Sequence, residues 1–165
     1  MIKGLHHSAY RCRRSEETRR FYEDFLGLPL ASTLDLTETK TGRTTRALHT
    51  FYRLDDGSYL TFFEVPESPF DFKMQHDFDL HIVLEVDRAV LDAMRAKAAA
   101  QGVETRGIAD HGFFESIYFR DPNGYVIELC AKKLDHDTAM DPATNGAREK
   151  LHRWTENFSK SASSA

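Results

Sequence analysis

Alternating apolar and polar residues divide the first 132 residues into two successive series of predicted elements. Each series begins with a strand, continues with an amphipathic helix and ends with three further strands. In the first series, a strand at 2–12 leads to a helix that Ser15 is expected to cap and Gly27 to end. The three strands that follow are predicted at about 29–37, 45–54 and 58–65.

The same order of elements returns after a predicted linker at 66–77. A strand at 80–86 precedes an alanine-rich helix at 88–101, and strands follow at about 104–109, 114–120 and 124–132. The chain therefore contains two βαβββ modules, at about 2–65 and 78–132. We predict an α+β fold in which both modules build one domain, residues 1–132, around a cupped mixed sheet.

Residues 133–165 are predicted to form a C-terminal extension of different character. Asp141-Pro142 is a suitable helix start, and apolar residues recur at helical spacing at Ala147, Leu151, Trp154 and Phe158. One amphipathic helix is expected here, packed on the body or on a second subunit, which makes a homodimer a candidate assembly. The end of the chain, from residue 159, is expected to be disordered.

Composition narrows the classes of function. With 165 residues, 41% hydrophobic content and a net charge of −4, the chain is expected to be a soluble, cytoplasmic globular protein. It shows no signal peptide, no apolar run of membrane-spanning length and no unbalanced basic run, so neither a membrane nor a nucleic acid is expected as partner. Cys12 and Cys130 are expected to be reduced thiols. Eight histidines justify a search for a metal site.

Residues 111–128 carry more chemical information than any other segment. Two apolar runs flank the turn Asp-Pro-Asn-Gly at 121–124, a pattern typical of a hairpin. Glu128 lies in the second run, between Ile127 and Leu129. A carboxylate in an apolar strand is costly unless it is paired or binds a cation. Taken alone, it can also be a glutamate that faces water at a strand edge.

Alignment of the two modules supplies partners for this carboxylate. His7 and His81 open the first strands of the two modules, and Thr61 and Glu128 each lie four residues after a turn glycine. Strand alternation supports this register, and two modules that face each other would bring His7, His81 and Glu128 together inside one concave sheet. Two imidazoles and a carboxylate are the typical protein ligands of non-haem Fe(II), although Zn, Mn or Ni also fit such a set. The neighbouring His6 is expected to face the opposite side of its strand.

Three segments make the chain similar to the vicinal oxygen chelate superfamily, which includes glyoxalases, bleomycin resistance proteins and extradiol dioxygenases. These segments are His7–Cys12 followed by Phe21–Gly27, then Leu80–Val86, then Ile117–Glu128. The resemblance covers residues 2–132 and implies paired βαβββ modules with a divalent metal in the cup. The substrate would chelate that metal through vicinal oxygens.

Within the superfamily, the segment from His111 to Glu128 most resembles small, single-domain type I extradiol dioxygenases, although Ala109 departs from their usual pattern. This resemblance implies that Glu128 is a metal ligand and that Tyr118 and His111 are catalytic groups. It also implies Fe(II), a catecholic aromatic substrate and O₂. Glyoxalase I-like relatives usually carry a fourth protein ligand where this chain has Thr61, which favours a three-ligand site.

One feature of the extradiol pattern is missing. These enzymes keep an acid/base histidine near the end of the first module, where this chain has Gly57-Ser58-Tyr59. His49 is the candidate to replace it, with Tyr59 and His76 as weaker ones. Three hypotheses therefore stand: an Fe(II) extradiol dioxygenase, a lyase, isomerase or thiol transferase that uses another divalent metal, and a metal-free drug-binding protein.

Overall fold

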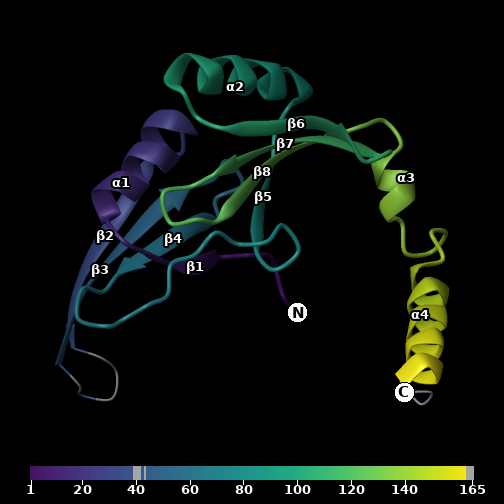
Figure 1. Ribbon diagram of the computed structural model, residues 1–165, viewed down its shortest axis with the longest axis horizontal. Coiled ribbons are helices and arrows are strands. Elements are labelled where there is room, and N and C mark those ends of the chain that lie inside the picture. Colours follow the sequence, from purple (N-terminus) through teal and green to yellow (C-terminus); the bar gives the residue numbers. More distant parts are fainter. Residues whose placement is uncertain (39–41, 43, 163–165) are drawn as a thin grey trace.

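The computed structural model describes residues 1–38, 42 and 44–162, with the last five of these described by their backbone alone. Two four-stranded mixed sheets, one for each module, make up the body of the protein (Figure 1). The strand order is β1-β4-β3-β2 in the first sheet and β5-β8-β7-β6 in the second. The α+β fold class with two βαβββ modules is therefore confirmed.

The strand bounds agree with the predicted ones to within a few residues, except for β1. The first sheet contains β1 (His7–Cys12), β2 (Leu30–Glu38), β3 (Thr44–Arg53) and β4 (Tyr59–Glu64). The second contains β5 (His81–Glu85), β6 (Thr105–Asp110), β7 (Phe114–Arg120) and β8 (Val126–Lys132). β1 begins five residues later than predicted, at the position where it starts to pair with β4.

Helix α2 (Arg88–Gln101) has the predicted bounds and covers one face of the second sheet (Figure 1). It buries Leu91, Met94 and Ala98, which recur at helical spacing. Gly102 ends it in the left-handed conformation, with φ of 66°.

The helix of the first module differs from the prediction at its start. It comprises α1 (Ser15–Arg19) and a π-helical turn η1 (Arg20–Phe25), and its N-cap is Arg14 rather than Ser15. Ser15 is the first helical residue rather than the cap, and its backbone N–H donates to the Glu64 carboxylate over 2.6 Å. A carboxylate from β4 thus satisfies the helix start, and its charge suits the helix dipole.

Strand pairing confirms the equivalence of the two modules. In the first module, Thr61 pairs with Ala9, two residues after His7. In the second, Glu128 pairs with Val83, two residues after His81. Both pairs of strands are parallel, so the two histidines and their partners hold matching places in matching sheets.

The turn between β7 and β8 joins the two modules. The Tyr22 hydroxyl donates to the buried Asp121 carboxylate over 3.1 Å, and the Arg13 backbone N–H donates to the Asn123 side chain over 2.9 Å. Gly124 has φ of 95°, and a Cβ there would lie 2.3 Å from the carbonyl oxygen of Lys73. Only glycine fits where the 66–77 linker crosses this turn.

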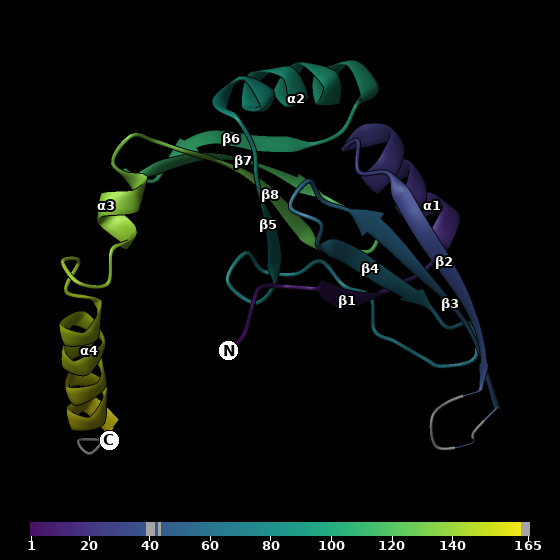
Figure 2. The same ribbon diagram turned by 180° about the vertical axis from the view of Figure 1, so that it is seen from behind.

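The C-terminal extension contains two helices, not one. α3 (His136–Met140) is a single short turn, and α4 (Ala147–Ala162) stands away from both sheets (Figures 1 and 2). Leu151 and Trp154 are mostly exposed on α4, while the side chain of Phe158 lies outside the described residues. The predicted packing of this helix on its own body is therefore not seen. The helix also runs past residue 159, where disorder is predicted to begin; residues 163–165 are not described.

No helix in the described part of the chain is both long and apolar enough to cross a membrane.

Candidate metal centre

A cavity of about 390 Å³ opens in the second module. It contains four of the six predicted site residues: His81 on β5, Glu128 on β8, Tyr118 on β7, and His111, which follows β6. The other residues that line it are Asp77, Phe78, Arg106, Ala109 and Phe114.

Glu128 is buried, with 4% of its surface exposed, on a strand whose two faces are both covered. The Ser116 hydroxyl donates to Oε1 of the carboxylate over 2.5 Å. Oε2 lies 3.5 Å from Nε2 of His81. One oxygen is therefore held by the protein, and the other faces an imidazole nitrogen.

The hydrogen bond made by Nδ1 of His81 determines whether Nε2, the nitrogen that faces Glu128, carries a proton. Nδ1 is hydrogen-bonded to the backbone carbonyl of Asp77. A carbonyl only accepts, so Nδ1 carries the proton, and Nε2 of a neutral His81 presents its lone pair. A lone pair and a carboxylate oxygen then face each other, which is unfavourable unless a proton or a metal cation lies between them.

The geometry of this pair fits a metal ion. Two ligands at about 2.1 Å from one ion lie about 3.0–3.4 Å apart for octahedral or tetrahedral angles. The observed separation of 3.5 Å is close to that range. Imidazole and carboxylate are also the ligand types that Fe, Mn, Zn and Ni accept. His81 and Glu128 therefore match two ligands of one divalent metal.

Tyr118 and His111 form a second pair in the same cavity. The Tyr118 hydroxyl lies 2.8 Å from Nε2 of His111, and the His111 ring stacks on Phe114 with centroids 4.7 Å apart. Burial, followed by the nearby Glu128 carboxylate, raises the pKa of Tyr118 above its ordinary value. The phenol stays protonated at neutral pH, so it can donate a hydrogen bond beside His81 and Glu128.

The structure places His7 apart from this cavity. Its ring lies 6.2 Å from His49 and 5.9 Å from Phe51, and Nδ1 lies 2.7 Å from Nδ1 of His6. Within the described part of the chain, no three His, Cys, Asp or Glu side chains gather closely enough to hold a metal. The three-ligand set that includes His7 remains a prediction, and one chain supplies only two members at one place.

His49 also lies in the first module and does not line the cavity. It is 7% exposed and stacks on Phe63, with centroids 3.7 Å apart. Its buried Nε2 has no hydrogen-bond partner among the described residues. Burial, and then His7, lowers the pKa of His49. The structure does not bring it to Tyr118 or His111, so its catalytic role remains a prediction.

Sequence reasoning missed three residues of the cavity region. Ser116 was detectable, because strand alternation places it on the same face as Tyr118. Arg106 pairs with Tyr118 across β6 and β7, a relationship that depends on the strand register. Asp77 anchors His81 through its backbone carbonyl. Every residue has such a carbonyl, so the amino-acid type at position 77 does not predict this contact.

Comparison with known proteins identifies the family to which this chain belongs. Residues 4–129 match the Glyoxalase/Bleomycin resistance protein/Dioxygenase superfamily, and the chain belongs to this family. No curated protein matches the sequence significantly.

Several solved structures share the fold. A glyoxylase/bleomycin resistance protein/dioxygenase domain from Frankia sp. EAN1pec has a TM-score of 0.63 at 18% identity, covering 81% of this chain and 100% of its own. The fosfomycin resistance protein FosX from Listeria monocytogenes, in complex with Mn(II) and sulfate, has a TM-score of 0.61 at 21% identity, covering 84% and 99%. An antibiotic binding protein from a Streptomyces species has a TM-score of 0.57 at 22% identity, covering 80% and 98%.

These likenesses establish the fold, and the proteins that share it differ in function. The resemblance to the superfamily is confirmed, whereas nothing in these comparisons selects the extradiol dioxygenases within it. The function therefore has to be argued from the cavity.

Proposed function

We propose that this protein is a divalent-metal-dependent enzyme whose metal ligands are His81, Glu128 and His7. The observation that carries this proposal is the facing pair of acceptors, Nε2 of His81 and Oε2 of Glu128. Ser116 and the Asp77 carbonyl hold the two side chains from behind, as partners of metal ligands commonly do. Such support is expected of a site built to receive a cation.

We further propose that His7 reaches the metal from a second copy of the chain. In one chain, His7 lies beside His49 and Phe51 in the first sheet, while the other two ligands lie in the second. A homodimer that sets the first sheet of one copy against the second sheet of the other would complete the set. The partner copy then contributes a residue to the site.

Mixed dimers test this arrangement. His7→Ala and Glu128→Ala chains each lack one ligand, and dimers of either variant alone should bind metal poorly. After joint refolding, a mixed dimer carries one intact site, so about half of the wild-type metal content per mixed dimer should return. If a His7→Ala chain binds metal as the unaltered chain does, this arrangement is wrong.

For the reaction, we propose extradiol cleavage of a catecholic aromatic by O₂, with Fe(II) as the favoured metal. His81, Glu128 and His7 would hold Fe(II), which would supply the activation of a catechol and of dioxygen. Tyr118 and His111 hold a proton between the phenol oxygen and Nε2, within reach of a substrate oxygen in the same cavity. Phe78 and Phe114 give the cavity apolar walls suited to an aromatic ring.

Oxygen uptake tests this reaction. Iron-loaded protein should consume O₂ with at least one member of a panel of catechols and yield a yellow ring-fission product. Glu128→Gln should abolish uptake, whereas Glu85→Gln, an exposed carboxylate on β5, should not. Iron-loaded protein that consumes no oxygen with any catechol would reject the dioxygenase.

The comparisons favour a second candidate, a reaction in which Mn, Zn or Ni acts as a Lewis acid. The FosX structure that shares the fold contains Mn(II), and that fold also occurs in an antibiotic binding protein. Metal analysis of the purified protein separates the candidates. Full occupancy by redox-inert Zn would favour the Lewis acid, and metal-independent ligand binding would favour a drug-binding protein.

A further inference from the structure

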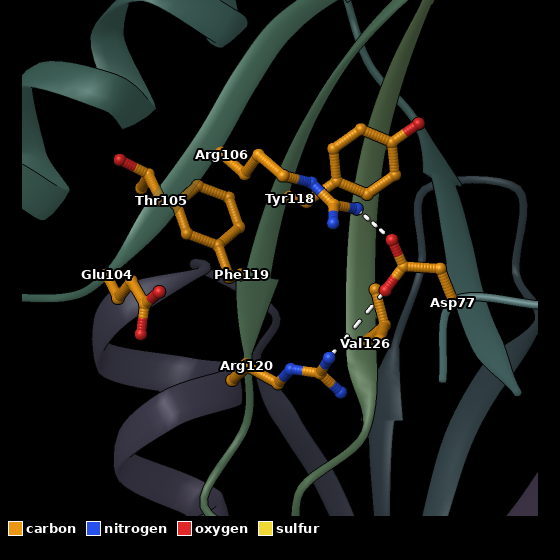
Figure 3. Close-up of a pocket in the computed structure, with 8 residues that line it drawn as sticks. All are labelled: Asp77, Glu104, Thr105, Arg106, Tyr118, Phe119, Arg120 and Val126. Carbon is orange, nitrogen blue, oxygen red and sulfur yellow. Dashed lines mark hydrogen bonds and ion pairs between the residues drawn. The ribbon is translucent and has the colours of Figure 1, made fainter. Parts of the chain in front are cut away.

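An ion-pair cluster lies beside the metal cavity. The guanidinium of Arg106 is hydrogen-bonded to Oδ2 of Asp77, and that of Arg120 lies 3.6 Å from Oδ1 of the same carboxylate (Figure 3). Asp77, Arg106 and Tyr118 line both the metal cavity and an adjoining hollow of about 100 Å³. The cluster therefore forms part of the wall between the two spaces.

The two arginines are not equivalent. Arg120 also donates to the backbone carbonyls of Gln75 and Gly124, which fix it in the structure. Arg106 has a 63% exposed side chain, and its guanidinium lies 4.8 Å from the centre of the Tyr118 ring. Arg106 can thus change its partner without breaking backbone contacts, and Arg120 cannot.

Charge in the cluster is unbalanced in favour of an anion. Two guanidiniums share one carboxylate, that of Asp77. Glu104, the other acidic residue of the smaller hollow, lies on the opposite side of it from Asp77 (Figure 3). An anion at Arg106 would therefore add a second negative charge to a cluster that has two positive charges and one negative charge.

We propose that Arg106 binds an anionic group of the substrate, a carboxylate or a similar oxyanion, in exchange for Asp77. This inference rests on the proposed function and narrows its substrate class to aromatics that carry a negative group beyond the metal-chelating oxygens. A guanidinium binds a carboxylate through two parallel hydrogen bonds, and the Tyr118 ring beneath Arg106 holds its plane. Arg106 would then orient the aromatic ring of the substrate, and the metal-chelating oxygens at the other end of that ring would lie at His81 and Glu128.

Variants of Asp77 and Arg106 should change anion binding in opposite directions. Its side chain competes for Arg106, while its backbone carbonyl anchors His81. Asp77→Asn removes the competing charge and keeps the carbonyl, so it should strengthen anion binding and leave metal content unchanged. Arg106→Gln removes the binding group and should weaken anion binding. Arg95→Gln, an exposed arginine on α2, is the matched control.

Anaerobic calorimetry on the metal-loaded protein, with catechol, 3,4-dihydroxybenzoate and benzoate as probes, measures the effect without turnover. We expect 3,4-dihydroxybenzoate to bind more tightly than catechol. Arg106→Gln should weaken its binding about tenfold or more, the size expected for a charge-assisted bond, and leave catechol binding unchanged. Asp77→Asn should tighten 3,4-dihydroxybenzoate binding, and Arg95→Gln should have no effect.

The outcomes separate this proposal from the proposed function. Binding of benzoate that depends on Arg106, without binding of either catechol, upholds the anion site and rejects a catechol enzyme. Equal affinity for catechol and 3,4-dihydroxybenzoate, or equal losses for both in Arg106→Gln, overturns the anion site and leaves the catechol function standing. Binding of none of the three probes overturns both.

Discussion

Nε2 of His81 lies 3.5 Å from Oε2 of Glu128, and neither atom has a proton to offer when the imidazole is neutral and the carboxylate ionised. The proton of His81 is on Nδ1, because that nitrogen donates to the Asp77 carbonyl. Two acceptors held face to face in a partly buried cavity are unfavourable unless a metal cation or a proton on Nε2 lies between them. This relationship makes the effect of the cation on stability a direct test of the site.

Glu128→Gln should not lower the stability of the metal-free protein, although it replaces a buried residue of the cavity. The glutamine amide can donate to Nε2 of His81, so we expect the metal-free variant to be as stable as the unaltered protein or more so. Added metal should raise the melting temperature of the unaltered protein and leave that of the variant unchanged. Thermal denaturation with and without Mn(II) measures both effects. A variant that is less stable without metal and still stabilised by it would contradict the site.

Ser116→Ala should weaken metal binding, although Ser116 is not one of the proposed metal ligands. The Ser116 hydroxyl, fully buried, is the donor that holds Oε1 of Glu128. Its loss leaves a buried carboxylate oxygen without that bond, at a cost of about 1–3 kcal/mol in the free energy of unfolding. Loss of a partner behind a ligand also lowers metal affinity about 10- to 100-fold. Urea denaturation and metal titration give the two values.

Ser58→Ala is the control for this change. Ser58 is also buried, but its hydroxyl donates to Asp56 in the turn between β3 and β4 of the first module. We expect this variant to bind metal as the unaltered protein does. Equal losses of metal affinity in the two variants would show that Ser116 acts only through general stability.

Tyr118→Phe should lower turnover more than substrate binding. The change removes the hydroxyl that lies 2.8 Å from Nε2 of His111 and keeps the aromatic ring under Arg106. If the pair moves a proton, kcat should fall about a hundredfold with little change in KM. His111→Gln should have a similar effect, and the double variant should be no worse than either single one. Additive losses would mean that the two residues act separately.

Much of this site follows from two periodicities in the sequence. The repeat of the βαβββ order places Glu128 at the counterpart of Thr61, and the strand pairing shows both residues at the same offset from a histidine. Alternation puts His81 and Glu128 on the lining side of β5 and β8. These features depend on local backbone geometry, which residue type and spacing determine.

The unpredicted features depend on contacts between distant segments. Glu64 replaces Ser15 at the start of α1 because β4 ends beside it, and the Asp77 carbonyl holds His81 whatever side chain stands at 77. The distance between His7 and His81 is set by how the modules pack, since the repeat fixes equivalent positions without fixing their separation. Spacing therefore predicts equivalent positions in the two modules better than it predicts the distance between them.

The bond between Tyr22 and Asp121 should contribute more to stability at neutral pH than in acid. The Tyr22 hydroxyl donates to the Asp121 carboxylate. Burial raises the pKa of Asp121, and the hydrogen bonds that the carboxylate accepts lower it by less, so the pKa lies above its ordinary value. Because the folded pKa lies above the unfolded one, the stability that Asp121 gives is greatest below its unfolded pKa. It is lost as pH rises through the folded pKa.

Tyr22→Phe removes one of the donors that favour the ionised carboxylate, so the folded pKa of Asp121 should rise further. We expect the variant to lose about 1–3 kcal/mol of unfolding free energy at pH 7 and less in acid, as Asp121 takes up its proton. Urea denaturation across this pH range measures the difference. Tyr10→Phe, another tyrosine whose ring packs beside Phe62, is the control and should show a smaller loss with no such pH dependence. A Tyr22→Phe loss that stays constant with pH would mean that the hydroxyl stabilises the junction of the modules without sensing the charge of Asp121.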